Sequence, residues 1–84
     1  MARELYGPRA DSFAMRFGID PELFRRLINQ ESGWNPYVTS PRGAYGLTQA
    51  MPATARDPGF GVAPLTDIDN PDEQLRFGAE YFSK

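Results

Sequence analysis

Apolar residues recur at helical spacing near the start of the chain. Between Pro8 and Gly18 they fall three and four positions apart, as on one face of a helix: Ala10, Phe13, Ala14 and Phe17. Gly18 suits the C-terminal end of such a helix, because glycine readily adopts the left-handed conformation found there. The residues before Pro8 show no pattern, so we predict an N-terminal arm over residues 1–7.

A second amphipathic stretch follows, with clear signals at both of its ends. Asp20 is a good N-cap, Pro21 suits the first helical position, and Glu22 favours the positive end of the helix dipole. Gly33 closes the helix. Its apolar residues are Leu23, Phe24, Leu27 and Ile28.

The remaining chain alternates loops with short helical patterns. Residues 33–46 and 56–69 are rich in glycine and proline and are predicted to be loops, while residues 46–55 read as short helical pieces. Asn70 and Glu73 form an Asn-x-x-Glu capping box that starts a last helix. No stretch has a convincing strand period. The pattern therefore predicts a mainly α fold with about four helical segments.

The length and the end of the chain bear on its domain organisation. With 84 residues the chain is long enough for one small domain, which we place at residues 8–84. The last helical pattern reaches Lys84 without a terminating signal. We therefore expect the chain to be a fragment or the front portion of a larger protein.

Composition narrows the chemistry that the chain can perform. Nine Lys and Arg against eleven Asp and Glu give a formal charge of −2, and the arginines are scattered, which argues against a nucleic-acid binder. Cysteine and histidine are both absent, so thiolate metal sites are excluded and the most versatile general base is missing. Acid–base chemistry is left mainly to carboxylates and tyrosines. No apolar run has the length of a membrane span, and the start of the chain lacks the apolar segment of a signal peptide.

Glu31 is the carboxylate whose position calls for an explanation. It follows Leu27 by four residues and Ile28 by three, so it shares the face that those residues bury. Burial and the negative end of the helix dipole would both raise its pKa, which suits a general acid. The alternative is a glutamate that is exposed in the last helical turn or bonded to the loop. Helix position alone favours this alternative.

Residues 31–55 resemble the signature of the soluble lytic transglycosylase (SLT) family of peptidoglycan-cleaving enzymes. The family pattern is matched in order and spacing by Glu31-Ser32, Trp34-Asn35-Pro36, Ser40, Gly43-Ala44, Gly46-Leu47, Gln49 and Met51-Pro52-Ala53-Thr54-Ala55. The segment "NPDEQLRFGAEYF" also resembles the helix that follows in these enzymes, so the resemblance covers roughly residues 10–84. It implies a lysozyme-like helical domain, here apparently truncated before its last helices.

The resemblance also implies a mechanism that rests on Glu31 alone. Glu31 would protonate the glycosidic oxygen between N-acetylmuramic acid and N-acetylglucosamine. It would then deprotonate the muramoyl 6-hydroxyl, which attacks the anomeric carbon and gives a 1,6-anhydro end. Most glycosidases need a second carboxylate, and an intramolecular hydroxyl removes that need. The nearest other acids read as turn or cap residues: Asp57, Asp67, Asp69 and Asp72.

Four further residues are candidates for substrate binding. The resemblance implies that Ser40 bonds near the catalytic site and that Gln49 and Met51 line the groove. Taken alone, Ser40 reads equally as a turn-capping hydroxyl, Gln49 as an exposed helix residue, and Met51 equally as core filler. Tyr45 is favoured as a flat surface for a sugar, whereas Trp34 is favoured as a core residue. We expect neither a cofactor nor a metal site.

The chain departs from the family in three ways. Thr48 and Ala50 replace the Met and larger aliphatic residue that the family often has, which suggests a smaller or more polar groove floor. The chain also ends before the Ala-Tyr-Asn segment whose tyrosine shapes the site, so we expect an incomplete site. The start without a signal peptide fits a bacteriophage protein packaged in the virion, and equally a chain whose signal has been trimmed.

The expected partners are peptidoglycan glycan strands at the bacterial cell wall, together with other parts of a virion or secretion assembly. We expect no nucleic acid and no membrane span. Two alternatives to a lytic transglycosylase stay open. One is a non-catalytic structural component of a phage DNA-ejection or secretion apparatus. The other is a hydrolase of the goose-type lysozyme kind, which would leave a reducing sugar end.

Overall fold

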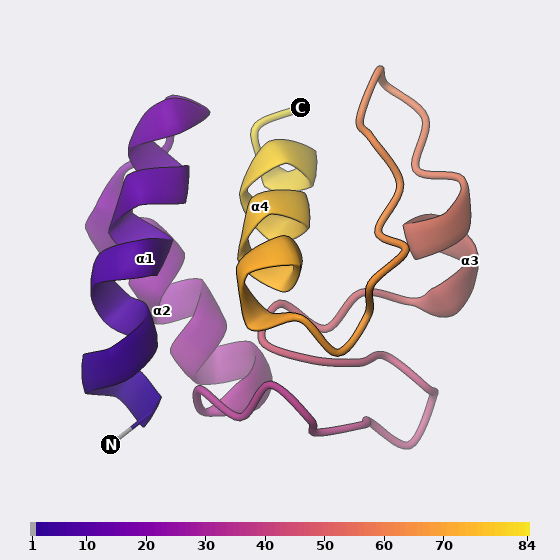
Figure 1. Cartoon of the computed structure of the whole chain (residues 1–84), viewed down its shortest axis with the longest axis horizontal. Helices are drawn as coiled ribbons and strands as arrows, with labels where there is room; N and C mark the ends of the chain where they lie inside the picture. Colours follow the sequence, from indigo (N-terminus) through magenta and orange to yellow (C-terminus); the bar gives the residue numbers. More distant parts are fainter. Residues whose placement is uncertain (1) are drawn as a thin grey trace.

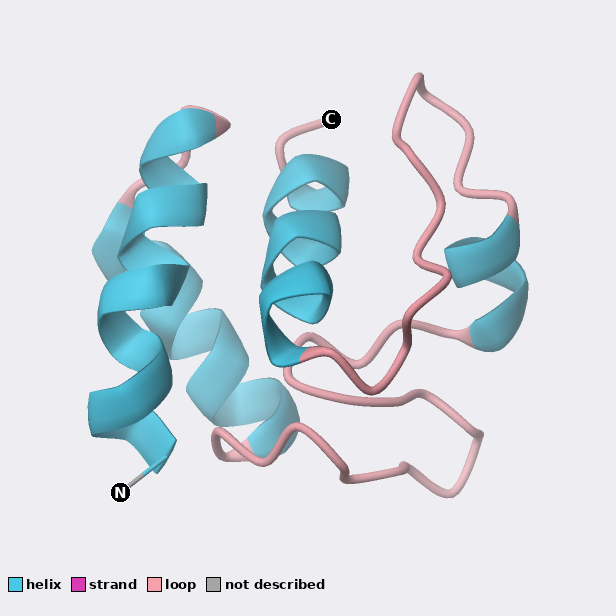
Figure 2. Cartoon of the chain, in the orientation of Figure 1, coloured by secondary structure: helices cyan, strands magenta, loops and turns pink. Residues whose placement is uncertain are grey.

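The computed structural model describes residues 2–84 and is mainly helical, which confirms the predicted fold class. The helices are α1 (Ala2–Arg16), α2 (Pro21–Ser32), α3 (Pro52–Arg56) and α4 (Pro71–Phe82). Helix α1 packs against both α2 and α4, whereas α3 lies beyond α4 and is joined to the rest by long loops (Figure 1). Figure 2 shows how much of the chain between α2 and α4 is loop. These loops carry most of the family signature.

The ends of α2 and α4 follow the predicted capping signals. The Asp20 carboxylate accepts a hydrogen bond from the Glu22 N–H at 3.0 Å, and Gly33 ends α2 in the left-handed conformation at φ +60°. The Asn70 side chain accepts from the N–H groups of Asp72 and Glu73. The second half of the predicted capping box is absent, because the Glu73 carboxylate pairs with Arg76 instead.

The arm predicted over residues 1–7 is wrong for the residues that the structure describes, because α1 already begins at Ala2. Pro8 lies inside the helix, although proline removes a backbone donor there. Packing explains the longer helix: Gly7 is buried, and a Cβ at this position would come within 2.9 Å of the Arg25 guanidinium on α2. Tertiary contact therefore outweighs the weak local pattern. The domain boundary at residue 8 stays a prediction.

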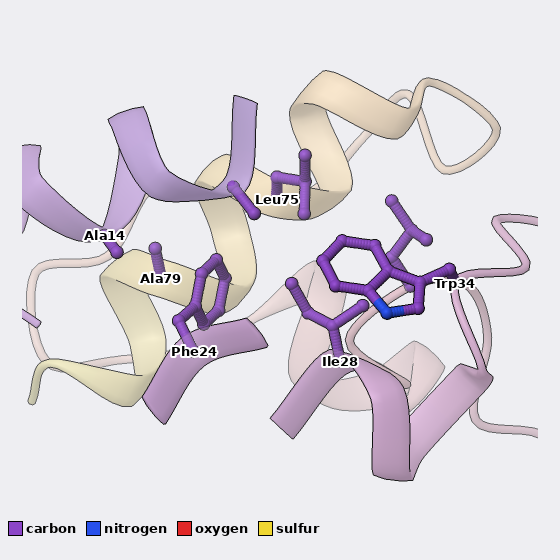
Figure 3. Close-up of a cluster of buried hydrophobic side chains, with 8 residues drawn as sticks. Ala14, Phe24, Ile28, Trp34, Leu75 and Ala79 are labelled. Carbon is purple, nitrogen blue, oxygen red and sulfur yellow. The ribbon is translucent and has the colours of Figure 1, made fainter. Parts of the chain in front are cut away.

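The main core lies where α1, α2 and α4 meet (Figure 3). Small residues on α1 and α4 lie where α1 packs on its two neighbours, and Phe24 and Ile28 of α2 fill the space between the helices. Trp34 is 3% exposed and packs in this core, as predicted, although its backbone has a φ of +68°. The complete buried cluster is Ala10, Ala14, Phe24, Ile28, Trp34, Leu47, Leu75 and Ala79. A second, smaller cluster joins α3 and the following loop to α4: Ala55, Val62, Leu65 and Phe77.

A bidentate ion pair joins α1 to α2 and makes part of the stability depend on pH. Arg25 donates to both carboxylate oxygens of Asp11, at 2.8 and 2.7 Å. These hydrogen bonds hold the pKa of Asp11 below its ordinary value. The folded pKa is the lower one, so the contribution is complete above the unfolded pKa and is lost as pH falls through the folded pKa.

We expect Asp11→Asn to lower the free energy of unfolding at neutral pH by about 1 kcal/mol. As pH is lowered to strongly acidic values, the free energy of unfolding should decrease less in this variant than in the unsubstituted protein. Urea unfolding followed through Trp34 fluorescence at several pH values measures both effects. Glu22→Gln is the control, because its pair with Arg26 is 71–75% exposed and should contribute much less. Equal losses for the two variants at every pH would contradict this account.

Candidate active site

Glu31 lies in the last turn of α2 between two buried anchors. Ile28 precedes it and is 0% exposed, and Trp34 follows it in the same core. The helix end is fixed by local hydrogen bonds as well: Gly33 N–H donates to the Asn29 carbonyl, and the Ser32 hydroxyl donates to the Ile28 carbonyl at 3.0 Å. The backbone of Glu31 is thus held firmly, which a catalytic carboxylate requires.

The predicted burial of Glu31 is wrong in this structure. Its side chain is exposed, although Ile28 on the preceding turn is fully buried and Leu27 is half-buried. The carboxylate has no hydrogen bond or ion pair within residues 2–84. Glu31 is therefore an exposed, unpaired carboxylate on a rigid helix end.

The Ser40 hydroxyl caps a turn, which is the structural alternative to substrate binding that the sequence offered for this residue. Its hydroxyl oxygen accepts a hydrogen bond from Ala44 N–H at 3.0 Å, and its backbone exchanges hydrogen bonds with Gly43 and Ala44. The hydroxyl caps this turn and donates no hydrogen bond within residues 2–84, so its proton remains available to another acceptor. The role of Ser40 in substrate binding stays a prediction.

Gln49 is not the exposed helix residue that its local sequence indicated. It ends a turn over residues 46–49 in the left-handed conformation, with a φ of +54°. Its side-chain amide donates to the carbonyls of Val38 at 3.1 Å and Gly46 at 3.0 Å. These two hydrogen bonds occupy both donors and leave the side-chain oxygen as a free acceptor. Backbone conformation, which the residue type did not signal, decides where this amide points.

Gln49 and Met51 line one pocket of about 240 Å³ between α2, α4 and the start of α3. Met51 is 41% exposed, so it is not core filler. Thr48 and Ala50 line the same pocket, and Thr48 lies directly against α4, where a Cβ at Gly78 would come within 2.3 Å of it. The remaining lining residues are Leu27, Thr54, Phe77, Gly78, Tyr81 and Phe82. We call this pocket the α2–α4 groove.

Glu31 is not among the residues that line the α2–α4 groove, but it lies one helical turn beyond the groove's α2 wall. Leu27 forms the α2 wall of the groove, and Glu31 lies four residues further on, one turn along the same face of the helix. The groove offers an amide and two hydroxyl-bearing threonines together with aromatic and aliphatic surface. Such a mixture suits a sugar, whose ring has apolar faces and hydroxyl edges. The arrangement places a carboxylate one helical turn from a pocket with this character.

Tyr45 lies in a different pocket from Gln49 and Met51. Its hydroxyl donates a hydrogen bond to the Asp69 carboxylate, and its backbone bridges Thr39 and Ala50. The tyrosine borders a pocket of about 500 Å³ that is mostly apolar, with Ala55 and Leu65 at its base and Arg56 at its rim. The groove position favoured for Tyr45 is therefore not supported by the geometry, and its binding role stays a prediction.

The hydrogen bond to Asp69 raises the pKa of Tyr45 above its ordinary value. We expect spectrophotometric titration of the tyrosines to show one group that ionises after the others, and Asp69→Asn to remove this late step. The folded pKa is the higher one, so the contribution to stability is present below the unfolded pKa and is lost as pH rises through the folded pKa. A late step that persists in Asp69→Asn, or that survives Tyr45→Phe, would contradict the assignment.

The four other candidate acids occupy turn, cap or ion-pair positions of their own. Asp67 accepts from Asn70, Asp72 pairs with Arg9, and Asp57 follows the last residue of α3. Asp69 is engaged by Tyr45, a partner that the sequence did not reveal. Among residues 2–84 no three Asp or Glu side chains gather as a metal site.

A larger pocket lies away from these residues. It has a volume of about 830 Å³ and runs between α1 and α2, lined by Arg3, Asp11, Pro21, Glu22, Arg25, Arg26, Asn29, Gln30 and Trp34. Two of its arginines are already neutralised by Asp11 and Glu22. Size alone therefore does not identify the functional site. The smaller α2–α4 groove gathers more of the residues predicted to act together.

The fold defines a class of protein: a small lysozyme-like helical domain, here with an exposed carboxylate at the end of α2. The sequence model of the Transglycosylase SLT domain family matches residues 10–84, and the chain belongs to this family.

Curated relatives agree with the family assignment. The chain is 35% identical over 82 residues to an endo-type membrane-bound lytic murein transglycosylase A of Klebsiella pneumoniae, covering 90% of the chain and 40% of the relative. It is 36% identical over 84 residues to a membrane-bound lytic murein transglycosylase C of Glaesserella parasuis, covering 93% of the chain and 23% of the relative. A membrane-bound lytic murein transglycosylase F of Yersinia enterocolitica is 41% identical over 66 residues, covering 79% of the chain and 13% of the relative. The chain thus spans less than half the length of these relatives.

Proposed function

We propose that the chain carries catalytic residues of a peptidoglycan lytic transglycosylase. The enzyme cleaves the β-1,4 bond between N-acetylmuramic acid and N-acetylglucosamine and leaves a 1,6-anhydromuramoyl end. The observation that carries the proposal is the placement of Glu31, a carboxylate with no hydrogen bond or ion pair within residues 2–84, on a fixed helix end one turn beyond the α2 wall of the α2–α4 groove. Membership of the SLT family and the names of the relatives support the same reaction.

In the proposed mechanism Glu31 acts first as a general acid and then as a general base. It donates its proton to the glycosidic oxygen as the bond to the anomeric carbon breaks. The resulting carboxylate then takes the proton of the muramoyl 6-hydroxyl, whose oxygen attacks the anomeric carbon. Glu31 is protonated again at the end, and no water is consumed. A glycan that occupies the groove would shield the exposed carboxylate from water during these steps.

The groove residues would orient the sugar relative to Glu31. The free oxygen of the Gln49 amide can accept a hydrogen bond from a hydroxyl or an acetamido N–H, while Met51 offers apolar contact. Ser40 would donate its unused proton, and Tyr45 would contact the substrate from its separate pocket. A single carboxylate is sufficient, because the nucleophile is part of the substrate.

The proposed place of action is the bacterial cell wall, where the partners are peptidoglycan glycan strands. No helix in residues 2–84 has both the length and the apolar character needed to cross a bilayer. Assignment to a phage virion or a secretion assembly, and a purely structural role in either, stay predictions. The hydrolase alternative differs from the proposal in its product, because a hydrolase leaves a reducing sugar end instead of a 1,6-anhydro end.

The test is the product released from purified peptidoglycan by the native protein that carries this chain. Mass spectrometry should find muropeptides with 1,6-anhydro ends, each lighter by one water than the corresponding reducing-end product. Reducing ends would show a hydrolase of the goose-type lysozyme kind. Absence of any product would leave the structural role as the better account.

A further inference from the structure

Gln74 is the one polar or charged residue in residues 2–84 whose side chain is fully buried, with 1% of its surface exposed. It lies in the second turn of α4, next to Leu75 in the main core. A buried amide destabilises a fold unless its donors and acceptor find partners. Gln74 has partners for both donors and for its oxygen, and all three belong to loops.

The Gln74 amide ties together three separate segments. Its oxygen accepts from Leu47 N–H at 2.8 Å, and its nitrogen donates to the carbonyls of Pro36 at 2.9 Å and Ile68 at 2.7 Å. Pro36 belongs to the loop that leaves Glu31, and Leu47 to the turn that carries Gln49. Two separate parts of the signature are therefore attached to one side chain on α4.

Gly46 makes this attachment possible. Its φ is +83°, and a Cβ at this position would lie only 2.5 Å from Cδ of Gln74. Without a side chain at residue 46, the amide can approach the backbone and reach the N–H of Leu47. This contact accounts physically for a glycine of the family signature.

A single peptide unit connects Gln74 to Gln49. The N–H of Leu47 and the carbonyl of Gly46 belong to the same planar peptide group, so fixing one fixes the direction of the other. Gln74 holds the N–H, while the carbonyl accepts from the Gln49 backbone at 3.1 Å and from the Gln49 side chain at 3.0 Å. Gln74 and Gln49 thus form hydrogen bonds with opposite edges of the same planar peptide group.

We propose that Gln74 is a positioning residue for the α2–α4 groove. By fixing the Gly46–Leu47 peptide it sets the direction of the Gln49 side chain, and by binding the Pro36 carbonyl it holds the groove in register with Glu31. Gln74 acts through these groups and does not touch the glycan. The inference rests on the proposed function, since it takes the Gln49 amide to be a glycan ligand.

Gln74→Glu tests the inference with little change of shape. An ionised glutamate at position 74 can still accept the hydrogen bond from Leu47 N–H, but it has no N–H groups to donate to the Pro36 and Ile68 carbonyls. A protonated glutamate has one O–H and can restore one of these two hydrogen bonds. For the native protein acting on peptidoglycan, we expect the variant to raise KM by about 10-fold at neutral pH with a smaller change in kcat. This defect should shrink as pH falls, in a way that the unsubstituted protein does not show. If Gln74→Glu is unfolded at neutral pH, its KM is compared with that of the unsubstituted protein at about pH 5, because burial favours the neutral form of the introduced carboxyl group.

Ala10→Gly is the matched control for lost stability. Ala10 is fully buried on α1 and contacts none of the three loops through hydrogen bonds, so this variant should lose stability and keep its KM. A second measurement needs no turnover: in Gln74→Glu the side-chain NH₂ resonances of Gln49 should shift and the Leu47 amide should exchange faster with solvent, but not in Ala10→Gly. If the unsubstituted protein releases no product, the proposed function fails, and the resonances still decide whether Gln74 positions Gln49. An unshifted Gln49 NH₂ in Gln74→Glu, or an equal rise of KM in Ala10→Gly, would overturn the inference.

Discussion

Glu31→Gln is expected to reduce the turnover of peptidoglycan by about 10³-fold, the range that a general acid–base group contributes. Glutamine has the same shape but can neither deliver a proton to the glycosidic oxygen nor remove one from the 6-hydroxyl. The fold should be unaffected, because the Glu31 side chain is exposed and makes no bond within residues 2–84. The rate of release of soluble muropeptides by the native protein, with protein concentration corrected for folded fraction, measures the effect.

Glu22→Gln is the matched control for this loss. Glu22 is also an exposed glutamate on α2, but it lies in the first turn and only pairs with Arg26. Its replacement should change stability by about 0.5 kcal/mol or less and leave turnover unchanged. Undiminished release of anhydromuropeptides by Glu31→Gln would remove Glu31 from the mechanism.

Gly46→Ala should destabilise the fold more than any surface substitution. Two effects add: the left-handed backbone costs an alanine about 1–2 kcal/mol, and the new Cβ would displace a buried amide whose lost hydrogen bonds cost about 1–3 kcal/mol each. We expect a loss of about 3–5 kcal/mol in the free energy of unfolding. A domain of this size has about that much in total, so much of the variant should be unfolded at room temperature. Thermal and urea unfolding measure the loss.

Gly43→Ala separates the two effects. Gly43 lies in the same loop with a φ of +94°, but a Cβ there would have no atom within 4 Å. Its replacement should therefore cost only the backbone contribution of about 1–2 kcal/mol. If both alanine variants lose the same stability, contact between Gly46 and Gln74 contributes nothing and the special role of this glycine is lost.

The features that local chemistry determines could be predicted from the sequence. Asp20 and Asn70 cap their helices, and Gly33 ends α2 in the left-handed conformation, because each of these residue types satisfies backbone groups within its own turn. The spacing of Phe24 and Ile28 likewise placed them in the core. Such signals depend on a few neighbouring residues, so they can be read without knowledge of the fold.

The features that depend on distant contacts could not be predicted in the same way. The start of α1 is held by packing on α2, the Tyr45 hydroxyl pairs with Asp69 across 24 residues of sequence, and the Gln49 amide is fixed by Val38. The exposure of Glu31 also differs from what its spacing from Leu27 and Ile28 predicted. Each of these errors came from treating a residue by its local pattern where tertiary contacts decide.

The sequence around Gln74 indicates in part that this residue is buried. It stands in the segment "QLRFGA", where it directly precedes a core leucine. A polar residue at a buried helical position needs partners from outside its helix, and the nearby loops are the only long unpaired backbone available. Two of its three partners could not be inferred, because they lie 27 and 38 residues earlier in the chain.

The hydrogen bonds of Gln74 also imply an order of folding. The loops after α2 precede α4 in the chain, yet they are held by a side chain on α4, so closing them requires contacts between distant residues. Helices α1 and α2 are separated by a short connection and can pack early. The loops after α2 can become ordered only when α4 has packed against α1. The segment around Leu47 should therefore order late and open early, with amide exchange faster than in α2. During synthesis from the N-terminus, the α2–α4 groove would take shape only after α4 has emerged.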